Sequence, residues 1–247
     1  MRDKIYFASD FHLGVLPEAT SRARELRIVG WLDAIKHDAK ELFLVGDVFD
    51  FWFEYGTVVP KGFVRFFGKL AELADLGIQI TFFKGNHDMW MFGYLQKELG
   101  ARIVDDELLL ERDGKRFFIH HGDGLGPGDS KYKFLKSFFR SKLCQWLFAR
   151  LHPNLGIGIA QRWSQHSRAA SGGEETFLGE DREWLLQYAK EQLKDANYDY
   201  FIFGHRHVPY DIRLCSACRV INLGEWINHC TYAVWDGREL TLKKWTP

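Results

Sequence analysis

The sequence predicts a mixed α/β fold that carries one helical insertion, and three observations support this prediction. The first ninety residues alternate short apolar runs with stretches of helical spacing, the β-α-β-α-β order of a parallel sheet. After about residue 100 the apolar runs follow one another closely, as strands joined by short turns do. Residues 130–194 have mostly helical spacing and interrupt this order. We therefore expect one domain over residues 1–247, with a helical insertion at about 130–195.

The N-terminal part is expected to contain three strands and three helices. The strands are predicted at Lys4–Ser9, Glu41–Val45 and Ile78–Phe83, and the helices at Arg22–Ala39, Phe63–Leu76 and, as a short one, Met89–Leu99. In the two longer helices apolar residues recur close to the 3.6-residue period of an α-helix. They are Leu26, Val29, Leu32 and Ile35 in the first, and Phe63, Phe66, Phe67, Leu70 and Leu73 in the second.

The remaining strands lie on either side of the insertion. Before it they are predicted at Ile103–Val104, Glu107–Glu111 and Arg116–His120, with a hairpin turn at Asp113-Gly114. After it they are predicted at Tyr200–Phe203, Tyr210–Leu214, Arg219–Asn222, Thr231–Trp235 and Glu239–Lys244, with a turn at Asp236-Gly237. The insertion thus interrupts a sheet that continues beyond it.

The composition excludes several classes of protein. With 46% hydrophobic residues, the chain is apolar enough for a sizeable core and is not a disordered one. No apolar stretch approaches the roughly 20 residues of a membrane-spanning helix, and the N-terminus lacks the apolar segment and cleavage site of a signal peptide. We expect a cytoplasmic location. Four cysteines are too few for a disulfide scaffold, and Cys215 and Cys218 lack a second pair for zinc, so we expect them to be ordinary strand or turn residues.

Five short blocks share one pattern: an apolar run, then in most cases a small or glycine turn residue, then side chains that offer oxygen or imidazole nitrogen. They are Asp10-Phe11-His12, Gly46–Asp50, Gly85–Asp88, His120–Asp123 and Gly204–His207. Ligands of open α/β sheets bind at the carboxyl ends of the strands, so these blocks are expected on one rim. Two divalent ions at such a rim can hold the attacking and leaving oxygens of a phosphoryl displacement, and they need a bridging carboxylate. Asp47 is the best candidate for that bridge.

The candidate ligands combine hard oxygens with imidazoles. They are Asp10, His12, Asp47, Asn86, His121, His205 and His207. This mixture suits manganese first, with iron or zinc as alternatives, more than calcium or magnesium. Strand alternation turns His120 and His121 to opposite faces, and we favour His121 because Gly122-Asp123 follows it directly. Asp50, Asp88 and Asp123 are either turn formers or residues that orient metal-bound histidines.

The order D-x-H, G-D-x-x-D, G-N-H-D, H-G-D and G-H-x-H resembles the calcineurin-like metallophosphoesterase family over almost the whole chain. The resemblance implies a double β-sandwich flanked by helices. It also implies one metal held by Asp10, His12, Asp47 and His207, and another held by Asp47, Asn86, His121 and His205. By the same resemblance His87 lies beside the scissile phosphate as an acid or charge stabiliser, and Asp88 orients it.

The insertion is basic and aromatic. No Asp or Glu occurs from Ser130 to Gly173, while eight Lys or Arg residues do. We expect one helix at Tyr132–Leu151, in which Phe and Leu residues alternate with cations. One interpretation is a core helix with a solvated basic face. The other is a lid that receives acyl chains or enters a membrane interface, with its cations on anionic headgroups.

The segment Arg162–Arg168 resembles the lid of the family branch that hydrolyses UDP-2,3-diacylglucosamine. That likeness implies a UDP-linked acylated glucosamine as substrate and peripheral association with the inner membrane. It also implies that Ser167 and Arg168, together with Asn86 and His87, contact the sugar and phosphate of the substrate. The best-known members of the branch carry G-N-R-D where this chain has His87, so a soluble nucleotide phosphodiesterase or phosphatase is the alternative. A nucleic-acid-binding module is a further alternative, although Phe and Leu at helical spacing favour core or lipid, so no nucleic acid is expected.

Overall fold

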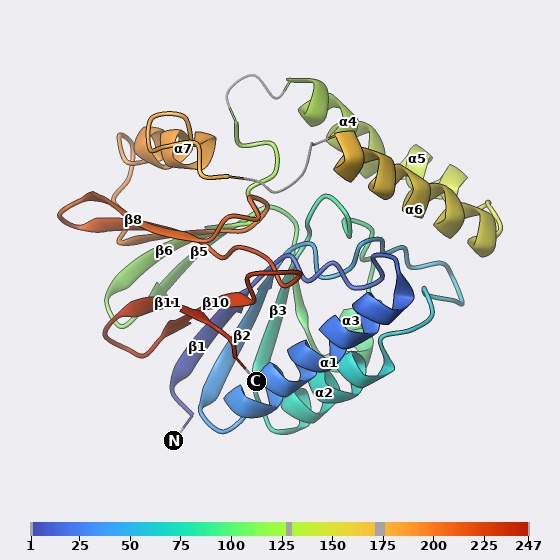
Figure 1. Cartoon of the computed structure of the whole chain (residues 1–247), viewed down its shortest axis with the longest axis horizontal. Coiled ribbons are helices and arrows are strands. Elements are labelled where there is room, and N and C mark those ends of the chain that lie inside the picture. Colours follow the sequence, from blue (N-terminus) through green and yellow to red (C-terminus); the bar gives the residue numbers. More distant parts are fainter. Residues whose placement is uncertain (1, 127–129, 171–175, 247) are drawn as a thin grey trace.

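Two β-sheets packed face to face form the centre of the protein, with helices on their outer sides (Figure 1). The computed structural model describes residues 2–126, 130–170 and 176–246, although for Ser130, Lys131 and residues 165–170 it describes the backbone alone. The six-stranded sheet has the order β11 (Leu240–Lys244), β10 (Thr231–Trp235), β1 (Lys4–Ala8), β2 (Ala39–Val45), β3 (Gln79–Phe83) and β4 (Arg102–Val104). The five-stranded sheet has the order β5 (Glu107–Arg112), β6 (Lys115–His120), β7 (Tyr200–Phe203), β9 (Cys218–Asn222) and β8 (Tyr210–Cys215).

Each sheet has a parallel centre. Strands β1 to β4 run parallel, as do β6, β7 and β9, while β10, β11, β5 and β8 add antiparallel edges. The inner faces of the two sheets bury one apolar cluster, in which the rings of Phe7 and Phe43 stack at 5.1 Å. The predicted α/β class and the double sandwich are therefore confirmed. Because parallel strands end at the same edge, the loops after β1, β2, β3, β6 and β7 all reach one rim.

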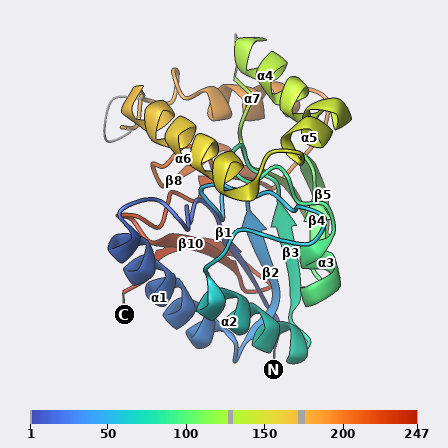
Figure 2. The ribbon, with the colours of Figure 1, turned by 90° about the vertical axis from the view of Figure 1, so that its right-hand side faces the viewer.

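Helices cover both outer faces. On the six-stranded sheet lie α1 (Glu18–Ile35), α2 (Val64–Asp75) and α3 (Tyr94–Leu99), and α7 (Trp184–Gln192) packs on the five-stranded sheet (Figures 1 and 2). The predicted helix at Arg22–Ala39 is displaced, because α1 begins at Glu18 and Ala39 already belongs to β2. Its predicted apolar face is also partly wrong, since Leu26 is 49% exposed.

Two buried charged residues explain the different face of α1. Arg24 donates to the carbonyl of His12 at 2.7 Å, and Glu25 accepts from the backbone amides of Arg65 and Phe66 at 3.0 and 3.2 Å. Both side chains are thus buried with partners, which the apolar pattern of the sequence does not reveal. The buried apolar residues of α1 are Ile28, Trp31, Leu32 and Ile35.

Three helices form a lid beyond the carboxyl ends of the strands: α4 (Ser130–Arg140), α5 (Lys142–Phe148) and α6 (Pro153–Ala170) (Figures 1 and 2). The single helix predicted at Tyr132–Leu151 is wrong, because Ser141 adopts an extended conformation and caps α5 by accepting from the amide of Cys144 at 3.1 Å. In the part of the chain with assigned structure, no helix is both long and apolar enough to cross a bilayer.

The lid rests on an aromatic cluster of the core. Phe53, Met89 and Trp90 are buried there, and Phe139 and Phe148 of the lid, which are partly buried, pack against them. The Trp90 indole donates to the carbonyl of Phe139 at 2.9 Å. The short helix predicted at Met89–Leu99 is therefore wrong in its first turn, because Met89 and Trp90 belong to a loop that packs against the lid.

Candidate metal centre

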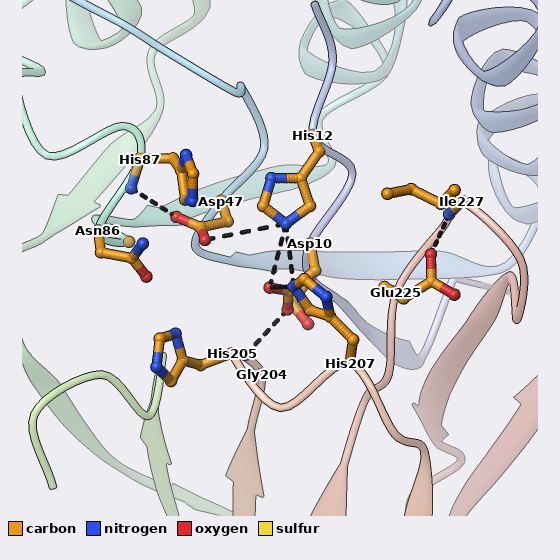
Figure 3. Close-up of polar contacts among 12 residues, drawn as sticks. Asp10, His12, Asp47, Asn86, His87, Gly204, His205, His207, Glu225 and Ile227 are labelled. Carbon is orange, nitrogen blue, oxygen red and sulfur yellow. Dashed lines mark hydrogen bonds and ion pairs between the residues drawn. The ribbon is translucent and has the colours of Figure 1, made fainter. Parts of the chain in front are cut away.

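The strand-end blocks meet at the rim between the two sheets, and several of their residues have unusual backbone angles. Asp10, His12, Asp47 and His205 all have positive φ, between 44° and 63°. Such angles are uncommon for residues other than glycine, and their concentration in one place is typical of a functional site. They turn each side chain inward from the end of its strand, so that the groups in Figure 3 converge.

Asp10, His12 and His207 form the first group of candidate ligand atoms. The Nε2 atoms of His12 and His207 are 3.1 Å apart, and the Oδ1 atom of Asp10 lies 3.7 Å from the former and 3.4 Å from the latter. Its Oδ2 atom accepts from the amide of His205 at 3.0 Å. Oδ1 is buried and has no hydrogen bond within the described residues. A buried carboxylate oxygen without a donor is what a bound cation would satisfy, so the group fits a divalent metal.

Asp47, His121 and His205 form the second group. The Nε2 atom of His121 is 3.4 Å from Oδ2 of Asp47 and 3.3 Å from the amide oxygen of Asn86. The Nδ1 atom of His121 donates to the carbonyl of Val45 at 2.8 Å, which leaves Nε2 to face Asp47. Burial alone would lower the pKa of His121, but the Asp47 carboxylate beside it raises this pKa to about 10.

Asp47 lies between the two groups. Its Oδ2 atom is 3.9 Å from Nε2 of His12 and 3.4 Å from Nε2 of His121. Its Oδ1 atom accepts from the amide of His87 at 2.9 Å (Figure 3). Burial alone would raise the pKa of Asp47, but the charges of neighbouring histidines hold it well below its ordinary value. The carboxylate is therefore an anion placed where both groups can share it.

The imidazole of His87 is held by Asp50 and Ser164. Its Nδ1 atom lies 3.1 Å from the Asp50 carbonyl oxygen and 3.3 Å from the Ser164 hydroxyl. Ser164, which is buried on α6, donates to Oδ1 of Asp50 at 2.9 Å. A residue of the lid is thus part of the site. No local pattern predicts this role, since Ser164 lies in Arg162–Arg168 but three residues before the expected Ser167.

The hydrogen bonds of Asp88 are to the backbone of the rim. Its carboxylate accepts from four backbone amides, those of Gly85, Asp47, Val48 and Phe49, at 2.8 to 3.2 Å. Burial and the nearby Asp47 raise the pKa of Asp88 to about 7. Asp88 therefore fixes the loop after β2 against the loop after β3.

Asp123 contacts the first helix of the lid. Its Oδ2 atom accepts from the Tyr132 hydroxyl at 2.5 Å and pairs with Lys136 at 2.8 Å, both on α4. Burial alone would raise the pKa of Asp123, but His121 and Lys136 lower it. Of the two adjacent histidines, His121 belongs to the second group, whereas His120 accepts from the Gly122 amide through Nδ1 at 2.7 Å. Asp123 thus connects the first lid helix to the rim.

Other candidates lie outside these groups. Ser167 and Arg168 belong to α6, but their side chains fall outside the described residues. Cys215 and Cys218 face each other at the turn between β8 and β9, and no potential metal group among the described residues includes them. Glu225 is buried near the site, yet it accepts from the amide of Ile227 and points away from the histidines (Figure 3).

The chain was compared with known protein families and proteins. The model of the calcineurin-like phosphoesterase family matches residues 3–209. A protein of Porphyromonas gingivalis named UDP-2,3-diacylglucosamine hydrolase is 43% identical over an alignment of 257 positions, gaps included, that covers 98% of each chain. Proteins with the same name are 28% identical in Ralstonia nicotianae, over 83% of this chain and 77% of the relative, and 27% identical in Haemophilus influenzae, over 90% of each.

Proposed function

The chain belongs to the calcineurin-like phosphoesterase family, and from this membership we propose that it hydrolyses UDP-2,3-diacylglucosamine. Water would cleave the pyrophosphate to give UMP and 2,3-diacylglucosamine 1-phosphate. The observation that carries the proposal is the likeness to the Porphyromonas gingivalis hydrolase over nearly the full length of both chains. We place the reaction at the cytoplasmic side of the inner membrane.

We propose that the two groups hold two divalent ions. Asp10, His12, Asp47 and His207 would hold one, and Asp47, Asn86, His121 and His205 would hold the other. The convergence of their donor atoms and the unpartnered Oδ1 of Asp10 support this assignment. Manganese is our first choice, because carboxylate, amide and imidazole ligands occur together. Bound ions of this kind supply Lewis acidity and a nucleophile drawn from water.

The remaining side chains of the site would bind and orient the pyrophosphate. His87 is proposed to stand beside the scissile phosphate, because Nδ1 faces Asp50 and the other ring nitrogen, Nε2, is left to donate to a phosphoryl oxygen. Asn86 is proposed to contact the same phosphate, and Ser167 and Arg168 of α6 to contact the sugar and its phosphate. His87 stands where the best-known members of the hydrolase branch have arginine, so it supplies one donor where a guanidinium supplies two.

The lid is proposed to meet the acyl chains and the membrane surface. Eight apolar side chains on α4 to α6 are each at least 46% exposed: Phe134, Phe138, Leu143, Trp146, Leu147, Leu155, Ile159 and Trp163. Exposed apolar side chains interleaved with cations suit a surface of acyl chains and anionic headgroups. A core helix would bury the same residues.

A turnover assay tests the proposal. The purified protein is given UDP-2,3-diacylglucosamine, or bis(4-nitrophenyl) phosphate as a generic phosphodiester, with and without added manganese and with and without detergent micelles. We expect manganese-dependent release of UMP that responds to micelle concentration. Cleavage of the generic diester without cleavage of the lipid substrate would contradict the proposal and favour a soluble nucleotide phosphodiesterase, the alternative that the His87 block supports.

A further inference from the structure

A cavity of about 900 Å³ lies next to the metal centre and takes no part in the assignments above. It is enclosed by α6, the N-terminal end of α1 and residues 58–63, and Figure 1 shows α6 above that end of α1. Asp50 lines its inner end, where Ser164 donates to the same carboxylate. The oxygen Oδ1 of Asp50 is also 3.8 Å from Nδ1 of His12. The cavity therefore begins beside the residues proposed to hold the metal and the phosphate.

One face of α6 leads from the metal centre into the cavity. Ser164, Gln161, Ile157 and Asn154 are separated by three, four and three residues, which places them on the same side of a helix. The last three line the cavity. Ten residues of helix rise about 15 Å, so a molecule whose phosphate lies beside Ser164 has room along this face for a nucleoside.

Four polar side chains of the lining lack partners within the described residues: Gln161, Asn154, Lys61 and Glu18. Carboxamides present a donor and an acceptor side by side, the pattern found on the edge of a pyrimidine base. Other polar residues of the lining are already engaged, since Ser21 accepts from the Gly14 amide at 2.8 Å and Arg22 pairs with Glu25 at 2.7 Å. The unpartnered amides are thus the groups that a ligand can use.

The lining of the cavity also contains apolar side chains, among them Leu13 and Phe51. Phe51 packs in turn against the buried aromatic cluster of Phe53, Met89 and Trp90. An acylated nucleotide sugar has one apolar half and one polar half. Burying an unpaired polar group costs free energy, so the unpartnered amides of the cavity favour the polar half, which can pair with them.

We propose that the cavity between α6 and the N-terminal end of α1 binds the pyrimidine nucleoside of the substrate, and of the UMP that leaves. The assignment rests on the proposed function for its substrate. It adds Gln161 and Asn154 as residues that determine specificity for the nucleotide half. The acyl chains then lie on the exposed apolar side chains of α4 to α6.

Filling the cavity provides the first test. A Cβ atom added at Gly158, which lines the cavity, meets nothing within 4 Å, so Gly158→Phe projects a ring into open space. We expect the KM for UDP-2,3-diacylglucosamine and the dissociation constant of UMP, measured by calorimetry, each to rise on the order of tenfold or more. Hydrolysis of bis(4-nitrophenyl) phosphate should not change. Gly68→Phe is the matched control, because Gly68 on α2 is equally open and lies outside the lining.

Removing a single amide provides the second test. Gln161→Ala should weaken UMP binding roughly fivefold, the loss expected for one hydrogen bond. It should leave the affinity for ribose 5-phosphate, which lacks the base, unchanged. Unaltered UMP binding in both Gly158→Phe and Gln161→Ala would overturn the proposal, as would a Gly158→Phe effect that depends on acyl-chain length alone.

Direct measurement of UMP binding distinguishes a wrong nucleoside site from a wrong lipid substrate. If the unaltered protein does not hydrolyse UDP-2,3-diacylglucosamine but binds UMP, and Gly158→Phe abolishes that binding, the lipid substrate is wrong and the nucleoside site stands. If the protein hydrolyses the lipid substrate and both variants bind UMP as before, the proposed function stands and the nucleoside site is wrong.

Discussion

At the scale of single residues, the geometry around Asp47 shows how little room the site allows. Its Oδ1 atom accepts from the His87 amide while Oδ2 faces His12 and His121. Behind it the backbone of Gly85 approaches so closely that an added Cβ atom would lie 2.2 Å from Oδ1. The close approach fixes the carboxylate on the side where the imidazoles converge.

Replacing Asp47 with asparagine should lower the activity without unfolding the protein. The amide oxygen of Asp47→Asn can still accept from the His87 amide, so we expect a folded protein with an unchanged circular dichroism spectrum. The bridging charge is lost, and metal-dependent turnover should fall at least about a hundredfold, since even indirect contacts to metal ligands are worth 10–100-fold. The variant's metal content should fall with its activity. Near-normal turnover would contradict the assignment of the bridge.

Two glycines provide a matched pair for the close approach at Asp47. In Gly85→Ala the new methyl group collides with Asp47, so we expect weaker manganese binding and a lower melting temperature. In Gly68→Ala the methyl group meets nothing within 4 Å inside helix α2, and stability should rise by up to about 1 kcal/mol. Thermal unfolding and metal titration of both variants check the expectation, and equal behaviour of the two would refute it.

The positions of the candidate ligands could be expected from sequence, whereas the partners of Asp88, Asp123 and Ser164 could not. The position of a metal-ligating residue at a strand end is set by the strand before it, and a regular apolar run in the sequence predicts that strand. The direction of a side chain in the following turn depends on φ and on neighbours far along the chain. Asp123 contacts Tyr132 and Lys136 of the lid, and Ser164 donates to Asp50, which lies 114 residues away in the sequence. No local sequence pattern predicts either contact.

At the scale of elements, the strands were predicted more closely than the helices. Most predicted strands agree with the structure to within two residues, because both sheets have buried central strands with continuous apolar runs. The predicted apolar face of α1 is partly wrong because Arg24 and Glu25 are buried through hydrogen bonds. The lid helices α4 and α5 are predicted as a single helix because the apolar spacing continues across the break at Ser141.

The packing of α6 on the core depends on Gly156. A Cβ atom there would lie 2.6 Å from the Tyr55 hydroxyl and 3.1 Å from the Phe148 ring, while Gly158 faces open space. We expect Gly156→Val to loosen the lid, at a cost of about 1–3 kcal/mol for overpacking. Gly158→Val changes the helix propensity by the same amount as Gly156→Val but places no atom against Tyr55 or Phe148. Hydrogen exchange of the α6 amides should therefore accelerate in the first variant only, and equal exchange in both would contradict this role of Gly156.

At the scale of the whole molecule, the proposed metal ligands come from both sheets. Asp10, Asp47 and Asn86 follow strands of the six-stranded sheet, and His121, His205 and His207 follow strands of the five-stranded sheet. The site lies where the two halves of the sandwich meet, so bound metal would connect them. Metal that binds the folded state alone stabilises it by mass action.

Removal of metal should therefore lower stability as well as activity. At a free manganese concentration about a hundred times the dissociation constant, the stabilisation is about 2.7 kcal/mol. We expect the melting temperature to rise on addition of manganese and to fall with a chelator. Asp47→Asn should respond to neither, and a chelator effect of equal size in that variant would show that the stabilising metal is bound elsewhere.

The hydrogen bond from the amide of His205 to the carboxylate of Asp10 joins residues 195 positions apart. During synthesis the ribosome releases Asp10 and Asp47 long before His205 and His207 exist, and contacts of such separation form late in folding. A nascent chain therefore holds isolated carboxylates and imidazoles rather than a site that selects a metal. By the proposed ligand assignment, both metal sites can therefore form only after His205 and His207 have left the ribosome, later than the lid residues.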